Sequence, residues 1–514
     1  MSRFLKLPLA ELCEKITDGT HHSPPNGPIG AFKYVTAKNI KPWGLDLEDI
    51  TYVDAEMHAE IYSRCDVRKG DVLYVKDGAG TGAVALNTLD EPFSLLSSVG
   101  VLRPGPALFP KYLLYALQEP DTKRSMLDNV AGVAITRLTL KKLNASEIPI
   151  APPAEQARIV AKLEELLSDL DAGVAELKAA QKKLQQYRQS LLKAAVEGAL
   201  TASWREAHRA ANTPLETGAQ LLERILRERR ARWEKKQLAK FKEQGKTPSK
   251  DWQKKYPEPV APDTTGLPEL PKGWVWASLD QLLSRLRSGT AETSTRELTP
   301  YPVLKSSAVR QGKIDFGALN YLHADQCRND DYLEDGDLLI SRLSGSVEYV
   351  GCCAVVQAVP PMSVQYPDRI FCGKLSSPSQ HIAIHVVNTL RSPSARIRIE
   401  AAAKSTAGHK RISLSDLHPF PVPLPPLAEM AALGEIVQTA LTCSDDMEAA
   451  LELARKQSTA QRQNILRAAF AGQLVPQDPD DEPASMLLER IRSERAAQPA
   501  TKKPRGRKTE EAAA

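Results

Sequence analysis

The sequence has few of the features that mark membrane, secreted or metal-binding proteins. No apolar run in its 514 residues reaches the roughly 20 residues that a membrane-spanning helix needs, and the first residues lack the apolar core of a secretory signal. The seven cysteines are odd in number and none lies in a CxxC pair, which argues against a disulfide framework or a cysteine zinc site. We therefore predict a cytoplasmic protein with reduced thiols and no membrane partner.

The common catalytic motifs are also missing. The sequence contains no GxxxxGK[ST], HExxH or GxSxG motif. The glycine-rich stretch at 78–84 follows an apolar segment, as a cofactor-binding loop would, but Ala83 stands where the last glycine is needed and no convincing helix follows. We predict that the chain has no catalytic residue, no metal site and no cofactor of its own.

The net charge of +5 does not by itself call for nucleic acid, but the cations are unevenly distributed. Residues 221–260 hold 13 Lys or Arg against 6 Asp or Glu, and the last residues add a basic PRGRK segment at 504–508. Such clusters can contact phosphate, and PRGRK resembles the core of a minor-groove AT-hook. A solvated helix face and a generic basic tail are the simpler interpretation of the two clusters.

An internal repeat decides the predicted architecture. Glu155 aligns with Glu429, and a shift of 274 residues holds without a gap as far as Leu200 and Leu474. Both copies begin after a proline pair and end at a glycine, which are start and stop signals for a helix of about forty residues. A second repeat follows each copy, where LLERILRER at 221–229 matches LLERIRSER at 487–495.

Apolar residues recur along both copies at spacings of three, four or seven, the pattern of a stripe that packs against another helix. Because helices this long need a partner, we predict that the two copies pack antiparallel as a coiled coil. The predicted seam comprises Leu163, Leu166, Leu170, Leu177, Leu184, Tyr187, Leu191, Val437, Met447, Leu451 and Ile465.

The segments before the two helices match more faintly. The pairs include Gly19 with Gly289 and the Gly-Asp dipeptides at 70–71 and 336–337, within short strands and glycine-punctuated turns. We predict a mixed α/β (α+β) fold with an internal pseudo-two-fold repeat. Its parts are a first globular domain at 1–150, a long helix at 151–205, a charged helix and linker at 206–265, a second globular domain at 266–425, a second long helix at 426–476, and a short helix with a basic disordered tail at 477–514.

The order of these parts resembles that of the specificity subunits of type I restriction-modification systems. The most specific matching segments are PIAPPAEQARIVAKLEELL, SLLKAAVEGALT, LLERILRERRARWE and PELPKGWVWASL. The second helix departs from the pattern at Met430, where a glutamine is usual. The resemblance covers nearly the whole chain.

The resemblance implies a non-catalytic DNA-binding subunit used in DNA methylation and phage defence. Each globular domain, or target-recognition domain, would read one half of a split site in double-stranded DNA. The helices would set the spacing and dock two methyltransferase subunits, and two ATP-driven motor-nuclease restriction subunits could join. S-adenosylmethionine, ATP and Mg would be bound by those partners. A stand-alone DNA methyltransferase or nuclease with unrecognised motifs, and a coiled-coil scaffold without a DNA role, are the alternatives.

Base edges are read by Arg, Lys, Asn, Gln, Ser and Thr, so loop residues of these kinds at matching places in the two domains are the candidates for DNA contact. In the first domain they are Thr20, His21, Lys38, Asn39, Lys76, Asp77, Thr136 and Arg137. In the second they are Arg287, Thr290, Lys305, Ser306, Arg310, Arg342, Ser344, His409, Lys410 and Arg411.

Overall fold

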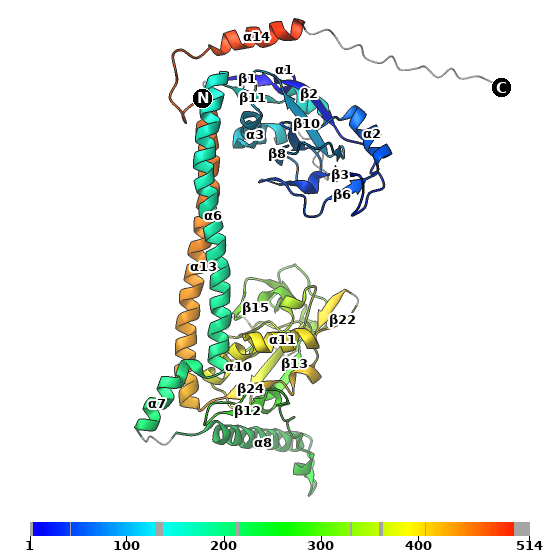
Figure 1. Ribbon diagram of the computed structural model, residues 1–514. Helices are drawn as coiled ribbons and strands as arrows, with labels where there is room; N and C mark the ends of the chain where they lie inside the picture. The colour runs from blue at the N-terminus through cyan, green and yellow to red at the C-terminus, as the bar shows by residue number, and fades with distance from the viewer. Residues whose placement is uncertain are drawn as a thin grey trace, which may run out of the picture. The chain divides into compact units, whose positions relative to one another are not determined.

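The computed structural model describes residues 4–41, 43–128, 137–211, 215–328, 332–358, 363–406 and 408–497. Its contacts divide the chain into two compact units, one formed by Met1–Lys178 with Leu451–Ala514 and the other by Ala179–Ala450. Each unit holds one α/β domain and parts of two helices of 44 residues, α6 (Pro153–Val196) and α13 (Leu427–Phe470) (Figure 1). This mixed architecture with two long helices is the predicted one.

Domain 1, in the first unit, is built on a four-stranded antiparallel sheet. The strand order is β2 (Cys13–Asp18), β10 (Val99–Pro104), β7 (Val72–Val75) and β8 (Val84–Leu86). Smaller sheets surround it: β1 (Leu5–Pro8) with β11 (Glu147–Ile150), β4 (Ile40–Lys41) with β5 (Gly44–Leu45), and β6 (Thr51–Val53), β3 (Phe32–Val35) and β9 (Ser94–Leu95). Its helices are α1 (Leu9–Leu12), α2 (Ala55–Arg64), α3 (Pro110–Gln118), α4 (Pro120–Asp128) and α5 (Leu140–Ala145).

Domain 2, in the second unit, repeats this topology. Its main sheet has the order β13 (Leu283–Ser288), β21 (Ile370–Leu375), β18 (Leu338–Ser341) and β20 (Cys353–Val355). The smaller sheets pair β12 (Val275–Ser278) with β24 (Pro421–Leu424), β14 (Pro302–Leu304) with β17 (Leu319–Tyr321), β15 (Val309–Arg310) with β16 (Lys313–Ile314), and β23 (His409–Arg411) with β19 (Leu343–Ser344) and β22 (Lys404–Thr406). The helices are α9 (Leu279–Leu282), α10 (Gln380–Arg391), α11 (Pro393–Ala402) and α12 (Leu414–Leu417).

The two long helices pack antiparallel within each unit. In the first unit, Leu163 and Leu167 of α6 share a buried cluster with Leu466 of α13. In the second, Leu191 of α6 is buried with Val437 and Leu441 of α13. The predicted leucines Leu166, Leu170, Leu177, Leu184 and Leu451, together with Ile465, are partly buried, which is typical of a two-helix seam.

The prediction is wrong for two seam residues, Tyr187 and Met447, which face solvent. Tyr187 and Met447 are 50% and 54% exposed. The seam position next to Tyr187 belongs to Arg188, whose guanidinium binds the Glu448 carboxylate (2.6 Å) beside Met447. Because the prediction assumed an apolar stripe, it chose Tyr187 and Met447. The seam is formed instead by their polar neighbours Arg188 and Glu448, which bind each other.

The ion pairs of the helices repeat as the helices do. Arg188 lies 2.7 Å from the Asp445 carboxylate in the second unit, and Arg462 lies 2.7 Å from that of Asp171 in the first. A shift of 274 residues converts Arg188 into Arg462 and Asp171 into Asp445. The same polar contact is therefore made in each unit with the roles of the two helices exchanged, as an antiparallel pseudo-two-fold pair requires.

The short repeats after the long helices cover equivalent faces. Helix α8 (Gly218–Glu243) buries Leu221 and Ile225 in the core of domain 2, and α14 (Ala484–Ala497) buries Leu487 and Ile491 in that of domain 1. Helix α7 (Ala202–Ala210) precedes α8, and the stretch at 246–273 joins α8 to domain 2. This stretch, which overlaps the end of the predicted 206–265 helix and linker, has little regular structure but packs on the domain, where the Val260 carbonyl accepts a hydrogen bond from Ser278 Oγ (2.5 Å).

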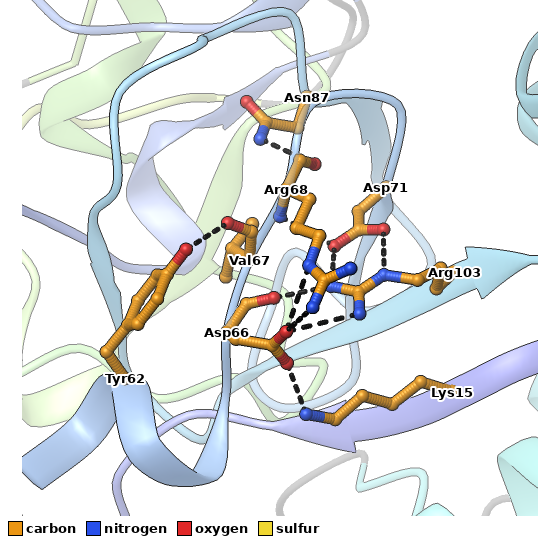
Figure 2. A network of polar contacts seen from close by, with 8 residues as sticks. All are labelled: Lys15, Tyr62, Asp66, Val67, Arg68, Asp71, Asn87 and Arg103. Atoms are coloured by element: carbon orange, nitrogen blue, oxygen red, sulfur yellow. Dashed lines mark hydrogen bonds and ion pairs between the residues drawn. The ribbon is translucent and has the colours of Figure 1, made fainter.

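The Gly-Asp dipeptides close equivalent turns. The Asp71 carboxylate accepts a hydrogen bond from the Arg68 amide (2.8 Å) and two from the Arg103 guanidinium (2.9 and 3.0 Å). Figure 2 shows how Asp66 joins this network through Lys15, Arg68 and Arg103. In domain 2, Asp337 accepts from the Glu334 amide (2.9 Å) and lies 3.6 Å from Lys374. The network ties the turn before β7 to the middle of the sheet.

We expect Asp66→Asn to lower the free energy of unfolding by about 1 to 2 kcal/mol at pH 7. Partial burial raises the pKa of Asp66, but the hydrogen bond from Lys15 and the charges of Arg103 and Lys15 outweigh it and lower the pKa to about 2. A depressed carboxyl pKa stabilises the fold above the ordinary value near 3.8 and ceases to do so as the pH falls through 2.

Urea unfolding of wild type and Asp66→Asn between pH 7 and pH 2 measures this difference. The difference should shrink below pH 4. The matched control is Asp90→Asn, because Asp90 pairs with Lys69 at 80% exposure and should change little. A difference that stayed constant down to pH 2 would contradict the linkage.

Among the described residues, no helix is long and apolar enough to cross a membrane, and no cluster of metal-ligating side chains occurs. The glycine-rich stretch at 78–84 joins the antiparallel strands β7 and β8. A nucleotide-binding glycine loop joins a strand to a helix, so this stretch is a hairpin connection of another kind.

Candidate nucleic-acid interface

Domain 2 carries an open polar groove at one end of its main sheet. Two adjoining hollows of about 660 and 140 Å³ share Ser306, Ser307 and Arg369 in their walls. Residues that line the groove lie at or just beyond the ends of β13 and β18, just before β21, and in the short helical turn at Ser306–Ala308. Three strand ends of a rigid sheet therefore position its walls.

The groove is lined by cations and by neutral hydrogen-bonding groups. Its four cationic side chains, which are all exposed, are Arg296, Lys305, Arg310 and Arg369, against the two carboxylates Glu292 and Asp368. Hydroxyl and amide groups complete the lining at Thr290, Thr293, Ser294, Ser306, Ser307, Asn320 and Ser344. Cations that attract phosphate, beside groups that can donate to or accept from base edges, are the chemistry of a DNA-reading surface.

Asn320 supplies the amide group in the lining of the groove. Its Nδ2 donates to Ser294 Oγ (2.9 Å), while its buried Oδ1 has no hydrogen-bond partner among the described residues. A buried acceptor without a partner is costly, which sets this side chain apart from an ordinary surface amide. Asn320 was not among the sequence candidates, because it lies inside β17 and a strand position gives no sign of facing a groove.

Tyr349 and Arg310 form one wall together. The Arg310 guanidinium lies over the Tyr349 ring, 4.7 Å from its centroid. The hydrogen bond between Tyr349 and Glu348 and the Glu348 charge raise the pKa of the Tyr349 hydroxyl. The guanidinium also donates to the Val309 carbonyl (3.0 Å), so the ring and the backbone together position Arg310.

Six of the ten sequence candidates of domain 2 line this groove: Thr290, Lys305, Ser306, Arg310, Ser344 and His409. The other four do not. Arg342 donates to the Asp368 carbonyl (3.2 Å) and covers Phe371, Arg287 lies within β13, and Lys410 and Arg411 lie on β23. Arg296, Ser307, Asn320, Tyr349 and Arg369 were missed, since nothing in their local sequence distinguishes them from ordinary surface residues.

The matching end of domain 1 holds a chain of ion pairs. Asp18, at the end of β2, is paired with Arg64 (2.8 Å) and with Lys76 (3.1 Å), and Lys76 lies 3.5 Å from Asp77. Asp77 in turn lies 3.5 Å from the exposed Arg137. This network joins the loops that follow β2 and β7 and gives them a fixed arrangement.

Two sequence candidates of domain 1 are excluded as direct DNA contacts by their burial. Lys76 is 2% exposed and paired with the equally buried Asp18. Asn39 is 2% exposed, and its amide donates to the Asp46 carbonyl (3.0 Å) and accepts from the Thr36 amide (3.0 Å). Both predictions are wrong for the same reason: a polar residue in a loop can brace the loop instead of facing outward.

The remaining candidates of domain 1 stay predictions. His21, Lys38 and Arg137 are exposed, and Thr20 is partly buried with its hydroxyl donating to the His22 carbonyl (3.1 Å). Thr136 lies outside the described residues, as does the PRGRK segment.

Comparisons with known proteins agree with this arrangement. Residues 11–181 match the family model of the type I restriction modification DNA specificity domain. The EcoKI specificity subunit of Escherichia coli (strain K12) is 26% identical over 475 residues, which cover 90% of this chain and 88% of that protein. The StySPI specificity subunit of Salmonella potsdam is 21% identical over 474 residues, which cover 90% of this chain and 88% of that protein. The chain is a relative of type I restriction enzyme specificity subunits.

A solved structure described as the structural basis underlying complex assembly and conformational transition of the type I R-M system has the same fold. Its TM-score is 0.60 at 16% identity, with coverage of 91% of this chain and 98% of that chain. The family-model match spans most of domain 1 and the first part of α6, and domain 2 repeats the same topology. The chain thus contains one domain that matches the specificity family model and a second domain with the same topology.

The departure at Met430 from the specificity-subunit pattern has a structural explanation. Gln156, the corresponding residue of α6, is fully buried and donates to the carbonyls of Ala107 (2.9 Å) and Ala151 (2.8 Å). Met430 is 1% exposed and belongs to the apolar core of domain 2. One helix therefore enters its domain through hydrogen bonds and the other through apolar packing.

Proposed function

We propose that this chain is the DNA-recognition subunit of a type I restriction-modification complex and that each of its α/β domains reads one half of a bipartite site. The groove of domain 2, with four exposed cations beside neutral hydroxyl and amide groups, is the observation that carries the proposal. Repetition of the domain topology supports two readouts, since two diverged copies can read two unrelated half-sites.

The long helices would serve as the spacer between the readouts and as the docking surface for two methyltransferase subunits. Those subunits would bind S-adenosylmethionine and methylate adenine. Two motor-nuclease subunits, with ATP and Mg, would join them to cleave unmodified DNA. This chain would contribute no catalytic group and would hold no cofactor.

Genome-wide mapping of methylated adenines with and without this chain tests the proposal as a whole. A split motif that appears only with the chain would support it. The purified full chain with labelled S-adenosylmethionine and DNA is the companion assay. Methyl transfer or DNA cleavage by the chain alone would instead favour a stand-alone enzyme, and absence of any DNA binding would favour a scaffold.

The groove itself is tested by Arg310→Ala and Arg369→Ala. Each is expected to weaken binding of the full chain to its site by roughly 10- to 100-fold, because one arginine contact to a base contributes about 1 to 3 kcal/mol of discrimination. Binding would be measured by fluorescence anisotropy on a duplex that carries the mapped motif.

Arg398→Ala is the matched control, since Arg398 lines a different hollow of domain 2, beside Pro421 and Pro423. It should bind within twofold of wild type. If the two groove variants behaved like this control, the groove would not be the reading surface.

A further inference from the structure

The second half of α8 and the stretch that follows it form a strongly basic projection from domain 2, which we term the basic arm (residues 230–256). It holds 10 Lys or Arg against 3 Asp or Glu. Two of the three carboxylates are already neutralised within the arm, Glu234 by Arg230 and Asp251 by Lys254. None of these charged residues lines the groove of domain 2.

The basic arm is an ordered element and not a loose tail. Trp252, in the stretch after α8, stacks on Trp233 with ring centroids 5.8 Å apart and meets Phe241 edge-on at 6.1 Å. Tyr256 packs against Trp233 at 5.4 Å and accepts a hydrogen bond from Arg229 (2.7 Å). These aromatic contacts fold the chain back along one side of α8.

Exposed cations run along α8 beside these aromatic contacts. Arg232, Lys236 and Lys240 recur every four residues, and Lys235 and Lys242 lie beside that row at helical spacing. All five are exposed, and none has a carboxylate within 4.0 Å among the described residues. Lys246, Lys250 and Lys255 extend the same unpaired charge onto the returning chain.

We propose that the basic arm is a second DNA-binding surface, which contacts the phosphate backbone of double-stranded DNA without reading its sequence. The inference rests on the proposed function, because it assumes that the chain binds DNA. Lysine is depleted from protein–protein interfaces, whereas unpaired lysines on a helix face are well suited to phosphates. Single-stranded DNA is disfavoured, since the aromatic rings that would stack on bases are already packed against one another.

The test compares the full chain with a variant in which Arg232, Lys235, Lys236, Lys240 and Lys242 are changed to Gln. The probe is a 60-base-pair duplex of random sequence, titrated between 50 and 300 mM KCl. Each lost phosphate contact makes the slope of log K against log [KCl] less negative by about 0.9. We expect a change of about 3 to 4 in the slope and at least a tenfold loss of affinity at 100 mM KCl.

A control variant removes five exposed cations elsewhere: Lys182, Lys183, Lys193, Arg209 and Lys456, each changed to Gln. It has the same net charge as the arm variant and should keep the wild-type slope within about 1.

Tryptophan emission checks that the arm remains folded, because Trp233 and Trp252 lie in it. If it changes, a second variant with Lys246, Lys250 and Lys255 changed to Gln takes its place, with an expected slope change of about 2.

An arm variant with the slope of the control variant would overturn the inference, even if the arm were then found to bind an acidic protein. That result would leave the proposed function intact if the variant still bound the mapped motif more tightly than random duplex. If the wild-type chain showed no preference for the mapped motif, the proposed function would instead be contradicted.

Discussion

Gly289→Ala is expected to destabilise domain 2 by about 3 kcal/mol or more. A Cβ atom at Gly289 would lie 1.9 Å from the carbonyl oxygen of Tyr366, which is backbone and cannot rotate away. The backbone around Gly289 would have to shift, and the hydrogen bond from the Thr290 amide to the Tyr366 carbonyl (3.0 Å) would break. Because Thr290 lines the groove, affinity for the cognate site should fall together with stability.

Thermal and urea unfolding measure the first effect and anisotropy measures the second. Gly345→Ala is the matched control, since Gly345 also lines the groove and a Cβ there would meet no atom within 4 Å. It should change stability by less than about 1 kcal/mol. Gly19 provides an independent repetition in domain 1, where the added Cβ would lie 1.9 Å from the Leu95 carbonyl oxygen. Tolerance of alanine at both glycines would contradict the close backbone approach.

Arg205→Ala should have a comparable or larger effect, a loss of about 3 to 5 kcal/mol of unfolding free energy in the second unit. Glu429, at the start of α13, is 1% exposed, and its carboxylate accepts hydrogen bonds from Arg205 (2.5 Å), Thr201 (2.6 Å) and Trp274 Nε1 (2.9 Å). Removing the guanidinium leaves a buried carboxylate with neutral partners only, and an uncompensated buried charge costs far more than a lost surface pair.

The double variant Arg205→Ala with Glu429→Gln separates the charge from the packing. It should recover part of the loss, because the neutral amide no longer requires a countercharge. Arg209→Ala, on the exposed side of the same helix α7, is the control and should be nearly silent. Equal stabilities of Arg205→Ala and Arg209→Ala would show that Glu429 does not depend on its arginine.

The sequence was most informative where a residue has only one structural solution. Gly19 and Gly289 were aligned from short, faint matches, and both lie where a backbone carbonyl leaves no room for a Cβ. The Gly-Asp dipeptides were aligned in the same way and close equivalent turns. A position with such a restriction keeps its residue type in both copies, so it can be recognised from sequence.

The seam of the long helices was predicted in outline and missed in detail. A heptad pattern assumes apolar residues, whereas Arg188 and Glu448 occupy the seam as a hydrogen-bonded pair. Each of these side chains is plausible on a solvated face when its partner is unknown. Only the alignment of one helix against the other shows that the two polar residues meet.

The candidate site was predicted less well than the fold for a related reason. Lys76 and Asn39 have the side chains expected of DNA contacts and lie in the expected loops. Both are buried, however, because Lys76 pairs with the Asp18 carboxylate and Asn39 donates to the Asp46 backbone carbonyl. Arg369 and Asn320 lie in the groove without any local sequence feature to distinguish them. Whether a polar side chain braces a loop or faces a ligand depends on which distant residues lie beside it.

The sequence by itself determined the duplication, the two long helices and the mixed α/β character of each domain. These follow from periodicity and from glycine and proline positions, which act over a few residues and are visible along the chain. The tertiary structure alone decided which polar residues are buried, which polar pair completes the helix seam and which cations gather in the groove and on the basic arm. Those outcomes depend on charges and hydrogen bonds between segments far apart in the chain, such as Arg188 and Glu448, which are separated by 260 residues.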